Sequence, residues 1–284
     1  MSNKGKVAVA LSGGLDSSVT CFLLKNQGYD VCAITVKMVD DAKFEQIANN
    51  AKKVADKIGI PHYVMDLSKE FKKDVIDYFE ESYKKGQTPN PCILCNRTIK
   101  WGRLFDFAVD ELGCDFVSSG HYARIVDDNG IKKMYPAKDL KKAQQYYLFE
   151  LDQRHLSRIL FPLCDYVKDD IRQIAAQNDL PSKSSKESQD ICFIPDGNHM
   201  KFIEEYTHEK VGRGNFLDIN GKVIGQHNGY YRYTVGQRKG INVNRDGKHY
   251  VLEIRPETNE VVVGRNKDLF KNQLIASDFN WISG

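Results

Sequence analysis

The sequence has no apolar run that approaches the ~18 residues of a membrane-spanning helix, so it predicts neither a transmembrane segment nor a membrane partner. Its first six residues lead directly into an apolar, strand-like stretch at 7–11. That arrangement leaves no room for the separate apolar stretch and cleavage site of a signal peptide. We therefore expect a cytoplasmic protein.

The pattern of a disulfide-stapled secreted domain is also missing, because 7 cysteines in 284 residues is an odd and sparse set. In a reducing compartment, clustered cysteines more often bind metal or carry out chemistry. Cys92 and Cys95 form the one closely spaced pair. Four others stand in helical, strand-like or apolar contexts and are expected to serve packing, namely Cys21, Cys32, Cys114 and Cys164.

A strong excess of one charge is absent, since 41 Lys and Arg face 38 Asp and Glu. Residues 201–284 hold 13 basic and 10 acidic residues, whereas residues 1–200 hold 28 of each. The whole excess therefore lies in the last part of the chain. A mildly basic segment fits both an ordinary solvated surface and a nucleic-acid contact, so charge does not decide between them.

The chain changes character near residue 200, which predicts two domains, 1–200 and 201–284. In the first, buried strands (7–11, 31–36, 63–67, 116–119) alternate with helices (17–27, 44–58, 75–84, 103–112, 169–178). This alternation predicts an α/β domain with a parallel sheet and ligands at the carboxyl ends of its strands. In the second, short β-rich stretches (216–219, 222–224, 230–235, 250–254, 261–263) are separated by Asn-Gly, Asp-Gly and Gly. They predict a small, mainly antiparallel β domain.

Between the first strand and the first helix lies Ser12-Gly13-Gly14-Leu15-Asp16-Ser17-Ser18. Small residues let a backbone close around phosphate, and a helix N-terminus offers free N–H groups and a positive dipole. Asp16 supplies a carboxylate suited to Mg²⁺. The Gly-Lys-Ser/Thr ending of a Walker A loop is absent. A serine-rich turn with an N-cap is the structural alternative, which the two glycines and the Asp disfavour.

This segment resembles the SGGxDS signature of the PP-loop ATP pyrophosphatases. The resemblance implies cleavage of ATP between its α and β phosphates and an adenylated carbonyl as the product, but it does not name the acceptor. The residues it implies for nucleotide binding are Ala10, Leu11, Ser12, Gly13, Gly14, Leu15, Asp16, Ser17 and Ser18.

The two closely spaced thiols follow Pro89 and Pro91, and we expect a helix to begin near Cys95. A helix N-terminus with nearby Arg97 and Lys100 lowers a thiol's pKa and enriches the reactive thiolate. Cys192 stands 97 positions after Cys95. Two alternatives remain open: a zinc half-site completed by His121, and a packing role for Cys192.

Four motifs occur in the order seen in the tRNA-specific 2-thiouridylases: residues 88–100, 119–124, 191–194 and 234–240. The resemblance runs from residue 7 to about residue 280. It implies adenylation of a uridine 2-carbonyl, replacement of its oxygen by sulfur at the tRNA wobble position, and Cys95 with Cys192 as the catalytic pair. In the family's persulfide scheme, Cys192 receives the sulfur, and Cys95 attacks it or closes a disulfide. The expected partners are RNA and a sulfur donor, either a protein or sulfide. The resemblance also implies ATP contacts at Val36 and Gly120, and RNA contacts at Asn90, Pro91, His121, Lys142, Gln144, Arg238 and Lys239.

Three features depart from that family pattern. Many members have Asp where this chain has Cys92, so three thiols (Cys92, Cys95 and Cys192) are available to hold a 4Fe–4S cluster whose open iron carries extra sulfide. A plain persulfide is the alternative. Residues 142–148 lack the carboxylate that the family has near its tRNA contact. The sequence ends at Gly284, where the family's C-terminal β-barrel would begin, so either the sequence is a shortened form or the RNA differs, for example rRNA.

Aromatic and basic residues also alternate in the second domain, at Tyr230, Tyr231, Arg232, Tyr233 and Arg245. Such a surface can stack bases and neutralise phosphates, although cross-strand pairing in a sheet uses the same residues. Two rival functions remain open. One is a PP-loop synthetase with a small-molecule acceptor, and the other is a non-catalytic iron–sulfur or zinc module that binds RNA.

Overall fold

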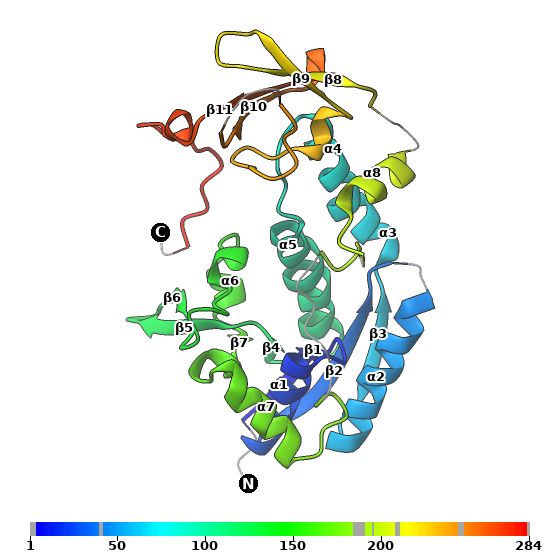
Figure 1. Ribbon diagram of the computed structural model, residues 1–284. Coiled ribbons are helices and arrows are strands. Elements are labelled where there is room, and N and C mark those ends of the chain that lie inside the picture. Colours follow the sequence, from blue (N-terminus) through cyan, green and yellow to red (C-terminus); the bar gives the residue numbers. More distant parts are fainter. Residues whose placement is uncertain are drawn as a thin grey trace. The chain divides into compact units, whose positions relative to one another are not determined.

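The computed structural model describes residues 4–39, 42–183, 191–194, 196–207, 211–243 and 247–282 (Figure 1). The chain forms two compact units. Unit 1 comprises Met1–Val75, Cys92–Gln189 and Phe279–Gly284, and unit 2 comprises Ile76–Pro91 and Asp190–Asp278. The units are interleaved along the chain, whereas the sequence predicted a single boundary near residue 200.

Unit 1 is built on a five-stranded parallel sheet of order β3-β2-β1-β4-β7, which confirms the predicted α/β fold. The strands are β1 (Lys6–Ala10), β2 (Asp30–Lys37), β3 (His62–Asp66), β4 (Phe116–Ser119) and β7 (Ile159–Leu160). The strand order reverses at β1, whose neighbours are β2 on one side and β4 on the other. Open α/β sheets bind ligands beyond the carboxyl ends of the strands at such a switch point.

Successive side chains of a strand point to opposite faces of the sheet, and both faces here carry apolar residues. Helices cover both faces and bury those residues. Val7 and Val9 of β1 pack against residues of α1 and α2, while Ala8 faces Trp101 and Phe105 in a separate buried cluster. The α-helices of unit 1 are α1 (Leu15–Asn26), α2 (Ala42–Ile58), α3 (Ser68–Phe71), α5 (Pro91–Leu94), α6 (Gln153–Leu156) and α7 (Lys168–Gln177).

Three stretches have π-helical hydrogen bonding: Lys72–Ile76, Cys95–Leu104 and Phe107–Glu111. Together with α5, the second and third make the helical region much longer than the predicted 103–112. The region begins at Pro91, because a proline at the first helical position lacks only an N–H group that would have no helical partner.

A two-stranded hairpin in unit 1, β5 (Ala123–Asp128) and β6 (Ile131–Pro136), was not predicted. Asn129 and Gly130 form its turn with φ of 53° and 87°. Asn-Gly is the pair most tolerant of two successive positive φ angles, so the sequence did contain the indication.

In its described residues, unit 2 contains a four-stranded sheet and two α-helices, α4 (Asp77–Lys84) and α8 (His199–Thr207). Its strand order is β10-β11-β8-β9, with β8 (Gly214–Leu217), β9 (Val223–His227), β10 (Tyr250–Arg255) and β11 (Glu260–Gly264). The pairing is antiparallel except between β11 and β8, which confirms a mainly antiparallel domain. Short 3₁₀ helices lie at Gln145–Leu148 and Pro162–Asp165 in unit 1, and at Tyr230–Arg232, Pro256–Thr258 and Asn266–Leu269 in unit 2.

Unit 2 includes α4 because three side-chain contacts hold that helix there. Phe79 meets Phe193 edge-to-face with ring centroids 5.4 Å apart. Tyr206 donates its hydroxyl to Asp77 at 2.7 Å, and Tyr230 donates to the carbonyl of Lys84 at 2.7 Å. Across the described residues of both units, no helix has the length and apolar character needed to cross a membrane.

Candidate active site

The loop after β1 turns sharply into α1 at the switch point of the sheet. Gly13 has φ of +73°, and a Cβ there would lie 3.0 Å from both the Ala51 nitrogen and the Asn50 Cβ of α2. A larger residue would therefore strain the turn and push against a neighbouring helix. Gly14, extended at φ −82°, precedes the first residue of α1.

Serine hydroxyls close this loop on itself. The Ser17 hydroxyl accepts a hydrogen bond from the Ser12 nitrogen at 3.2 Å and lies 3.1 Å from the Ser12 hydroxyl. It also donates to the carbonyl of Gly14 at 3.2 Å, and Ser18 donates to the same carbonyl at 2.7 Å. A rigid turn thus leads into a helix N-terminus, an arrangement that suits a phosphate.

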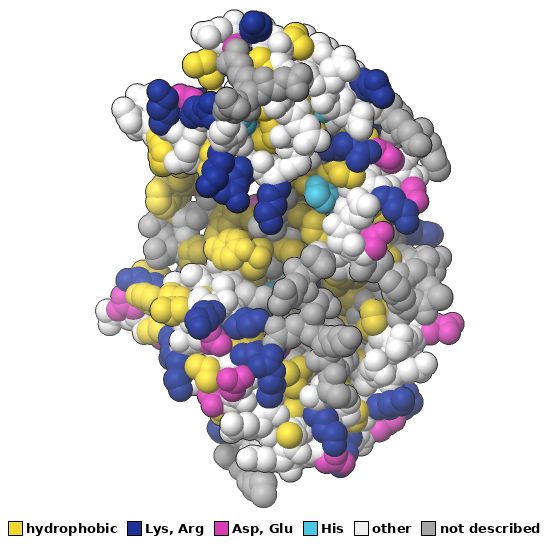
Figure 2. All heavy atoms as spheres, in the orientation of Figure 1, with side chains coloured by type: hydrophobic (Ala, Val, Ile, Leu, Met, Phe, Trp, Pro, Cys, Tyr) yellow, Lys and Arg dark blue, Asp and Glu magenta, His cyan; other side chains and the backbone are white. Residues whose placement is uncertain are grey.

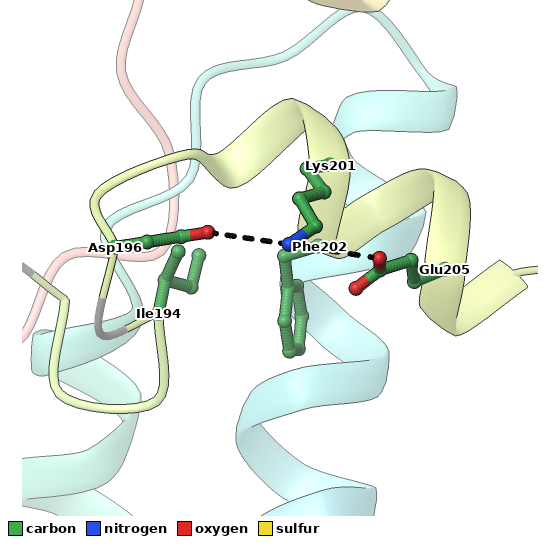
Figure 3. A pocket seen from close by; sticks show the side chains of 5 residues that line it. All are labelled: Ile194, Asp196, Lys201, Phe202 and Glu205. Atoms are coloured by element: carbon green, nitrogen blue, oxygen red, sulfur yellow. Dashed lines mark ion pairs between the residues drawn. The ribbon is translucent and has the colours of Figure 1, made fainter.

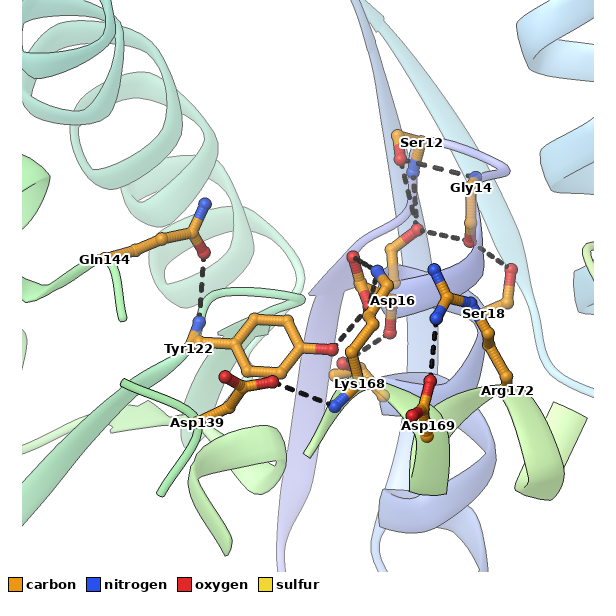
Figure 4. A network of polar contacts seen from close by, with 12 residues as sticks. Ser12, Gly14, Asp16, Ser18, Tyr122, Asp139, Gln144, Lys168, Asp169 and Arg172 are labelled. Carbon is orange, nitrogen blue, oxygen red and sulfur yellow. Dashed lines mark hydrogen bonds and ion pairs between the residues drawn. The ribbon is translucent and has the colours of Figure 1, made fainter. Parts of the chain in front are cut away.

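Asp16, predicted to bind Mg²⁺, lies in the first turn of α1 and already has two partners (Figure 4). The ammonium of Lys168 donates to both of its carboxylate oxygens, each at 2.8 Å. The phenol of Tyr122 donates to Oδ1 at 2.8 Å. Sequence reasoning missed both partners. Tyr122 stands within the 119–124 motif without an assigned role, and Lys168 is 152 positions from Asp16.

The structure brings Gly120, predicted to contact ATP, directly to this loop. A Cβ on Gly120 would lie 2.8 Å from the Ser17 nitrogen and 2.9 Å from the Asp16 Cβ. The end of β4 therefore touches the start of α1, at a distance that only glycine allows. Val36 lies near the carboxyl end of the adjacent strand β2 and packs on the same buried cluster as Ala10.

His121 is buried at 8% exposure, with its Nδ1 atom 2.6 Å from the Ser119 hydroxyl. Its ring packs near Trp101 and Phe161, with centroids 6.2 and 6.0 Å away. Burial, assisted by the charge of Lys100, holds the pKa of His121 well below its usual value. The imidazole is therefore neutral at pH 7, and its predicted contact with RNA stays a prediction.

Gln144 is tied to Tyr122 by two hydrogen bonds. The Tyr122 nitrogen donates to the side-chain Oε1 of Gln144 at 3.0 Å, and the Gln144 nitrogen donates to the Tyr122 carbonyl at 2.8 Å. The carbonyl end of the side-chain amide thus points inward, toward the backbone of Tyr122 (Figure 4). Lys142, two residues earlier, is half-buried.

Cys92 and Cys95 both lie in unit 1, on the helical region that begins at Pro91. Cys92 is in the first turn and reaches solvent, while Cys95 is 7% exposed. Although Cys92 has exposed surface, partial desolvation of its thiol by the surrounding protein raises its pKa, and the nearby charge of Lys100 opposes that rise only in part. The expectation of a lowered pKa was therefore wrong for Cys92. Arg97 pairs with Glu150 at 3.4 Å.

Cys192 belongs to unit 2 and is exposed. The turn that carries it is closed by a 2.9 Å hydrogen bond from the Ile194 nitrogen to the Ile191 carbonyl. Phe193 anchors the turn, because its ring packs against Phe202 at 5.3 Å in the buried aromatic cluster of α4 and α8. The convergence of Cys192 with Cys92 and Cys95 stays a prediction. Within the described residues of each unit, no three His, Cys, Asp or Glu side chains gather as a metal-binding group.

A pocket of about 210 Å³ lies beside the Cys192 turn in unit 2 and shares Ile194 with it (Figure 3). Lys201 crosses its polar side, 3.7 Å from Asp196 and 3.8 Å from Glu205. Phe202 contributes the apolar side. The pocket lining therefore holds one more acidic than basic side chain, and its single lysine lies between the two carboxylates.

The aromatic residues predicted to stack RNA bases are largely used inside unit 2. Tyr230 and Tyr231 are only 8% and 4% exposed, and the Tyr231 hydroxyl donates to Glu204 at 2.6 Å. Arg232 also pairs with Glu204. The ring of Tyr233 meets Phe216 edge-to-face at 5.2 Å. This burial favours packing over base stacking for these tyrosines, and Arg245 lies outside the described residues.

Arg238 and Lys239, in contrast, are exposed on a loop of unit 2. The side chain of Gln237 holds this loop, accepting from the Thr234 nitrogen at 3.0 Å and donating to the Lys239 carbonyl at 2.9 Å. Figure 2 shows Lys and Arg side chains on the face of unit 2 that is in view. Asn90 is half-buried and Pro91 buried. The RNA contacts predicted for these four residues stay predictions.

Two family models match the chain: the tRNA methyl transferase HUP domain at residues 5–196 and the tRNA methyl transferase PRC-barrel domain at residues 200–265. The tRNA-specific 2-thiouridylase MnmA of Carboxydothermus hydrogenoformans is 46% identical over 98% of this chain and 79% of its own length. The tRNA-specific 2-thiouridylase MnmA 2 of Clostridium botulinum strain Langeland is 45% identical over 99% of this chain and 80% of its own length.

Solved structures show weaker likeness. The U34-tRNA thiolase NcsA from Methanococcus maripaludis with its [4Fe-4S] cluster has 20% identity and a TM-score of 0.45, covering 72% of this chain and 67% of its own. A 4-thiouridine synthetase in complex with RNA and bound ATP has 19% identity and a TM-score of 0.44, covering 71% and 50%. Both are too distant to assign a ligand or a reaction to this chain.

The relatives therefore confirm the resemblance that the four motifs indicated. The matched domains cover the parallel-sheet unit and most of the β-rich residues, and 45–46% identity extends along nearly the whole sequence. The chain belongs to the tRNA-specific 2-thiouridylase family.

Proposed function

We propose that this protein is an ATP-dependent RNA sulfurtransferase that converts uridine to 2-thiouridine, at the wobble position of tRNA. One observation carries the proposal. A serine-closed phosphate loop at the switch point of the sheet and a helix bearing two thiols occur in one compact unit of a 2-thiouridylase family member. The first feature suits activation by ATP, and the second suits transfer of sulfur.

The names attached to the relatives disagree about the transferred group. The family models speak of a methyl transferase, whereas the relatives at 45–46% identity are called thiouridylases. The residues favour sulfur, because a phosphate loop that activates a carbonyl is needed for replacement of oxygen. Methyl transfer to a base nitrogen or oxygen requires no such activation.

Adenylation solves a leaving-group problem. The 2-carbonyl oxygen of uridine attacks the α-phosphate of ATP, pyrophosphate departs, and the oxygen then leaves with AMP when sulfur attacks the carbon. Phosphoryl transfer asks the protein mainly for positioning and for neutralisation of charge. The turn at Ser12–Ser18 and the N-terminus of α1 supply these, with Mg²⁺ bound alongside ATP. A base stacked in RNA cannot reach the site, so the uridine must be flipped out.

For sulfur carriage we propose the three thiols of Cys92, Cys95 and Cys192. Exposure of Cys92 and Cys192 leaves both open to a ligand or to a sulfur donor. A 4Fe–4S cluster on the three thiols would supply one iron with an open position for an extra sulfide. The alternative is a persulfide on Cys192, which Cys95 then attacks. Sulfide can load the open iron of a cluster directly, whereas the persulfide route needs a donor protein that already carries persulfide sulfur. Attack of Cys95 on the Cys192 persulfide then forms the Cys95–Cys192 disulfide and releases hydrosulfide, which attacks the activated carbon.

For RNA binding we propose Asn90, Pro91, His121, Lys142 and Gln144 near the flipped base, with Arg238 and Lys239 on phosphates. The exposure of the last two supports a phosphate contact, because Lys and Arg on a loop neutralise a backbone without reading its sequence. His121 is buried, so its proposed contact requires the flipped base to reach in from the surface of unit 1.

The test is thiolation of unmodified tRNA by anaerobically purified protein with ATP, Mg²⁺ and either sulfide or a persulfide donor. It is read by mass spectrometry of nucleosides together with AMP release. We expect 2-thiouridine from the natural chain and none from Cys95→Ser or Cys192→Ser. Cys164→Ser, at a half-buried thiol outside the proposed set, is the matched control and should remain active.

Other outcomes would contradict specific parts of the proposal. Full thiolation by both catalytic-site variants would remove the cysteines from the mechanism. ATP turnover that is indifferent to RNA would indicate a small-molecule acceptor, and activity on rRNA alone would change the substrate. Iron and zinc analysis of the same preparation, with its absorption spectrum, separates the cluster from the persulfide.

A further inference from the structure

The lysine that holds Asp16 is buried. Lys168 is 7% exposed, and its ammonium lies 2.8 Å from each carboxylate oxygen of Asp16. Lysine is almost never this buried unless it is paired, since a buried ammonium has lost its hydration. Asp16, at 31% side-chain exposure, is the more accessible partner. A ligand that approaches the phosphate loop therefore meets the carboxylate before the ammonium.

The position of Lys168 in its helix is electrostatically unfavourable. It is the first residue of α7, where the helix dipole is positive, and it reaches toward the N-terminus of α1, a second positive end. The two helices share one buried cluster that includes Leu15, Val19, Ile171 and Ala175, which fixes their approach. Two positive helix ends and an ammonium thus converge on Asp16. Such a concentration of positive charge suits an anion with more charge than one carboxylate.

Other carboxylates near α7 are bound elsewhere. Asp139 accepts from the backbone nitrogen of Lys168 at 3.0 Å, and Asp170 accepts from the Val167 nitrogen at 3.0 Å. Asp169 pairs with Arg172 at 2.8 Å. These acids satisfy the helix start and an exposed arginine, whereas Asp16 pairs with the Lys168 ammonium.

The role predicted for Asp16 conflicts with this arrangement. A carboxylate offers about four acceptor sites, and Lys168 with Tyr122 fills three of them. Mg²⁺ needs an oxygen at about 2.0–2.1 Å in near-ideal octahedral geometry. An ammonium on that same oxygen would repel the metal and occupy its approach. Asp16 can bind Mg²⁺ fully only after Lys168 has moved away, and Lys168 can leave only toward another anion.

We propose that Lys168 is a positioning residue of the nucleotide site that exchanges its anion: it pairs with Asp16 in the free protein and with the ATP phosphates once Mg²⁺ occupies Asp16. This inference rests on the proposed use of ATP. Lys168 and Mg²⁺ then compete for the Asp16 carboxylate. Binding of Mg²⁺ in turn strengthens binding of the ATP phosphates. The metal releases the ammonium that the phosphates need.

The experiment measures binding of a fluorescent ATP analogue to the full chain, first in EDTA and then during titration with Mg²⁺. We expect Lys168→Met to weaken binding at saturating Mg²⁺ by about tenfold or more, the loss expected for one charge-assisted contact, and to weaken metal-free binding less, because Asp16 holds the ammonium there. The same variant should also lower the Mg²⁺ concentration for half-maximal enhancement, because the competitor is gone. Lys168→Arg, which keeps the charge, should recover part of the binding at saturating Mg²⁺.

Two further variants guard against misinterpretation. Arg172→Met removes a cation from the same helix, where its pair with Asp169 is exposed, and should change neither quantity. Asp16→Asn removes the negative charge that holds the Lys168 ammonium but keeps a side chain of similar size. It should therefore tighten metal-free binding of the ATP analogue and abolish the increase in affinity on adding Mg²⁺. This variant tests the exchange even if Lys168→Met fails to fold.

The outcomes separate the exchange from the proposed function. Equal weakening by Lys168→Met with and without metal, at an unchanged Mg²⁺ midpoint, would reduce Lys168 to a structural ion pair and overturn the exchange while ATP use stands. Weaker metal-free binding by Asp16→Asn would overturn it as well. Absence of ATP binding by the natural chain would overturn the proposed function, and this inference with it.

Discussion

Tyr122 donates its hydroxyl to Asp16 at 2.8 Å, although the two residues are 106 positions apart in the chain. The backbone of the same tyrosine holds Gln144 through two hydrogen bonds of 3.0 and 2.8 Å. One residue therefore connects the phosphate loop with a segment proposed to bind RNA. A shift of Gln144 on RNA binding would be transmitted to the carboxylate at the start of α1.

The first prediction is that Tyr122→Phe weakens the mutual influence of RNA and ATP. RNA should raise the affinity of the natural chain for ATP, and ATP should raise its affinity for RNA by the same factor. Loss of the hydroxyl removes the hydrogen bond between Tyr122 and Asp16. The factor by which RNA raises ATP affinity and the factor by which ATP raises RNA affinity should therefore both fall several-fold. Binding of each ligand, measured with and without the other, gives the factors. Tyr135→Phe, on an exposed tyrosine of β6, is the control, and unchanged factors in Tyr122→Phe would contradict the link.

A second prediction concerns Gly120, whose added Cβ would lie 2.8 Å from the backbone nitrogen of Ser17. Since the nearest atom is backbone, either α1 or the end of β4 must shift, at a cost of about 1–3 kcal/mol in unfolding free energy. Gly120→Ala should therefore bind ATP about tenfold more weakly or worse. Gly212→Ala is the matched control, because the space around Gly212 is open and its φ is not positive. Comparable ATP affinities in both variants would show that the close approach is dispensable.

The elements that the sequence predicted best are those whose local pattern agrees with their tertiary setting. Strands 7–11, 31–36 and 116–119 are short apolar runs, and the structure buries them in one parallel sheet. The loop at Ser12–Ser18 was recognisable because its glycines and serines are needed locally, for the turn and for its closure. These features required no knowledge of distant contacts.

The predictions that failed concern residues whose structure depends on contacts with residues far away in the sequence. Residues 230–235 have the aromatic content of a strand, but Gly229 at φ 109° turns the chain and Tyr230 and Tyr231 insert into the core as a 3₁₀ helix. Burial there overrides β propensity. The pairing of Lys168 with Asp16 joins residues 152 positions apart, and no local pattern encodes it. The one indication was that Lys168 is the first residue of a helix, where the positive end of the helix dipole disfavours a lysine without an acidic partner.

A third prediction concerns acid stability. Burial lowers the pKa of His121 well below its ordinary value of 6.5, and it also lowers the pKa values of His62, His199 and His227. Below pH of about 6.5 the unfolded chain therefore binds more protons than the folded one at these sites, so stability falls as pH falls. Thermal unfolding followed from pH 7.5 to pH 5 should show this loss. His121→Gln should reduce the slope, and an unchanged slope would mean that His121 takes up its proton as readily in the folded as in the unfolded chain.

The last prediction separates the two cations near Cys92. Arg97 is held by Glu150 at 3.4 Å, whereas the charge of Lys100 acts on the thiol and offsets part of the rise that burial causes in its pKa. Lys100→Met should therefore raise the pKa of Cys92 further. Because the thiolate is the nucleophile, alkylation of Cys92 by iodoacetamide at pH 8 should slow, and its rate profile should move to higher pH. The rate is followed by mass spectrometry of the peptide that contains Cys92. Arg97→Met leaves Lys100 in place and should have the smaller effect; the reverse order would mean that Arg97, not Lys100, sets the reactivity of this thiol.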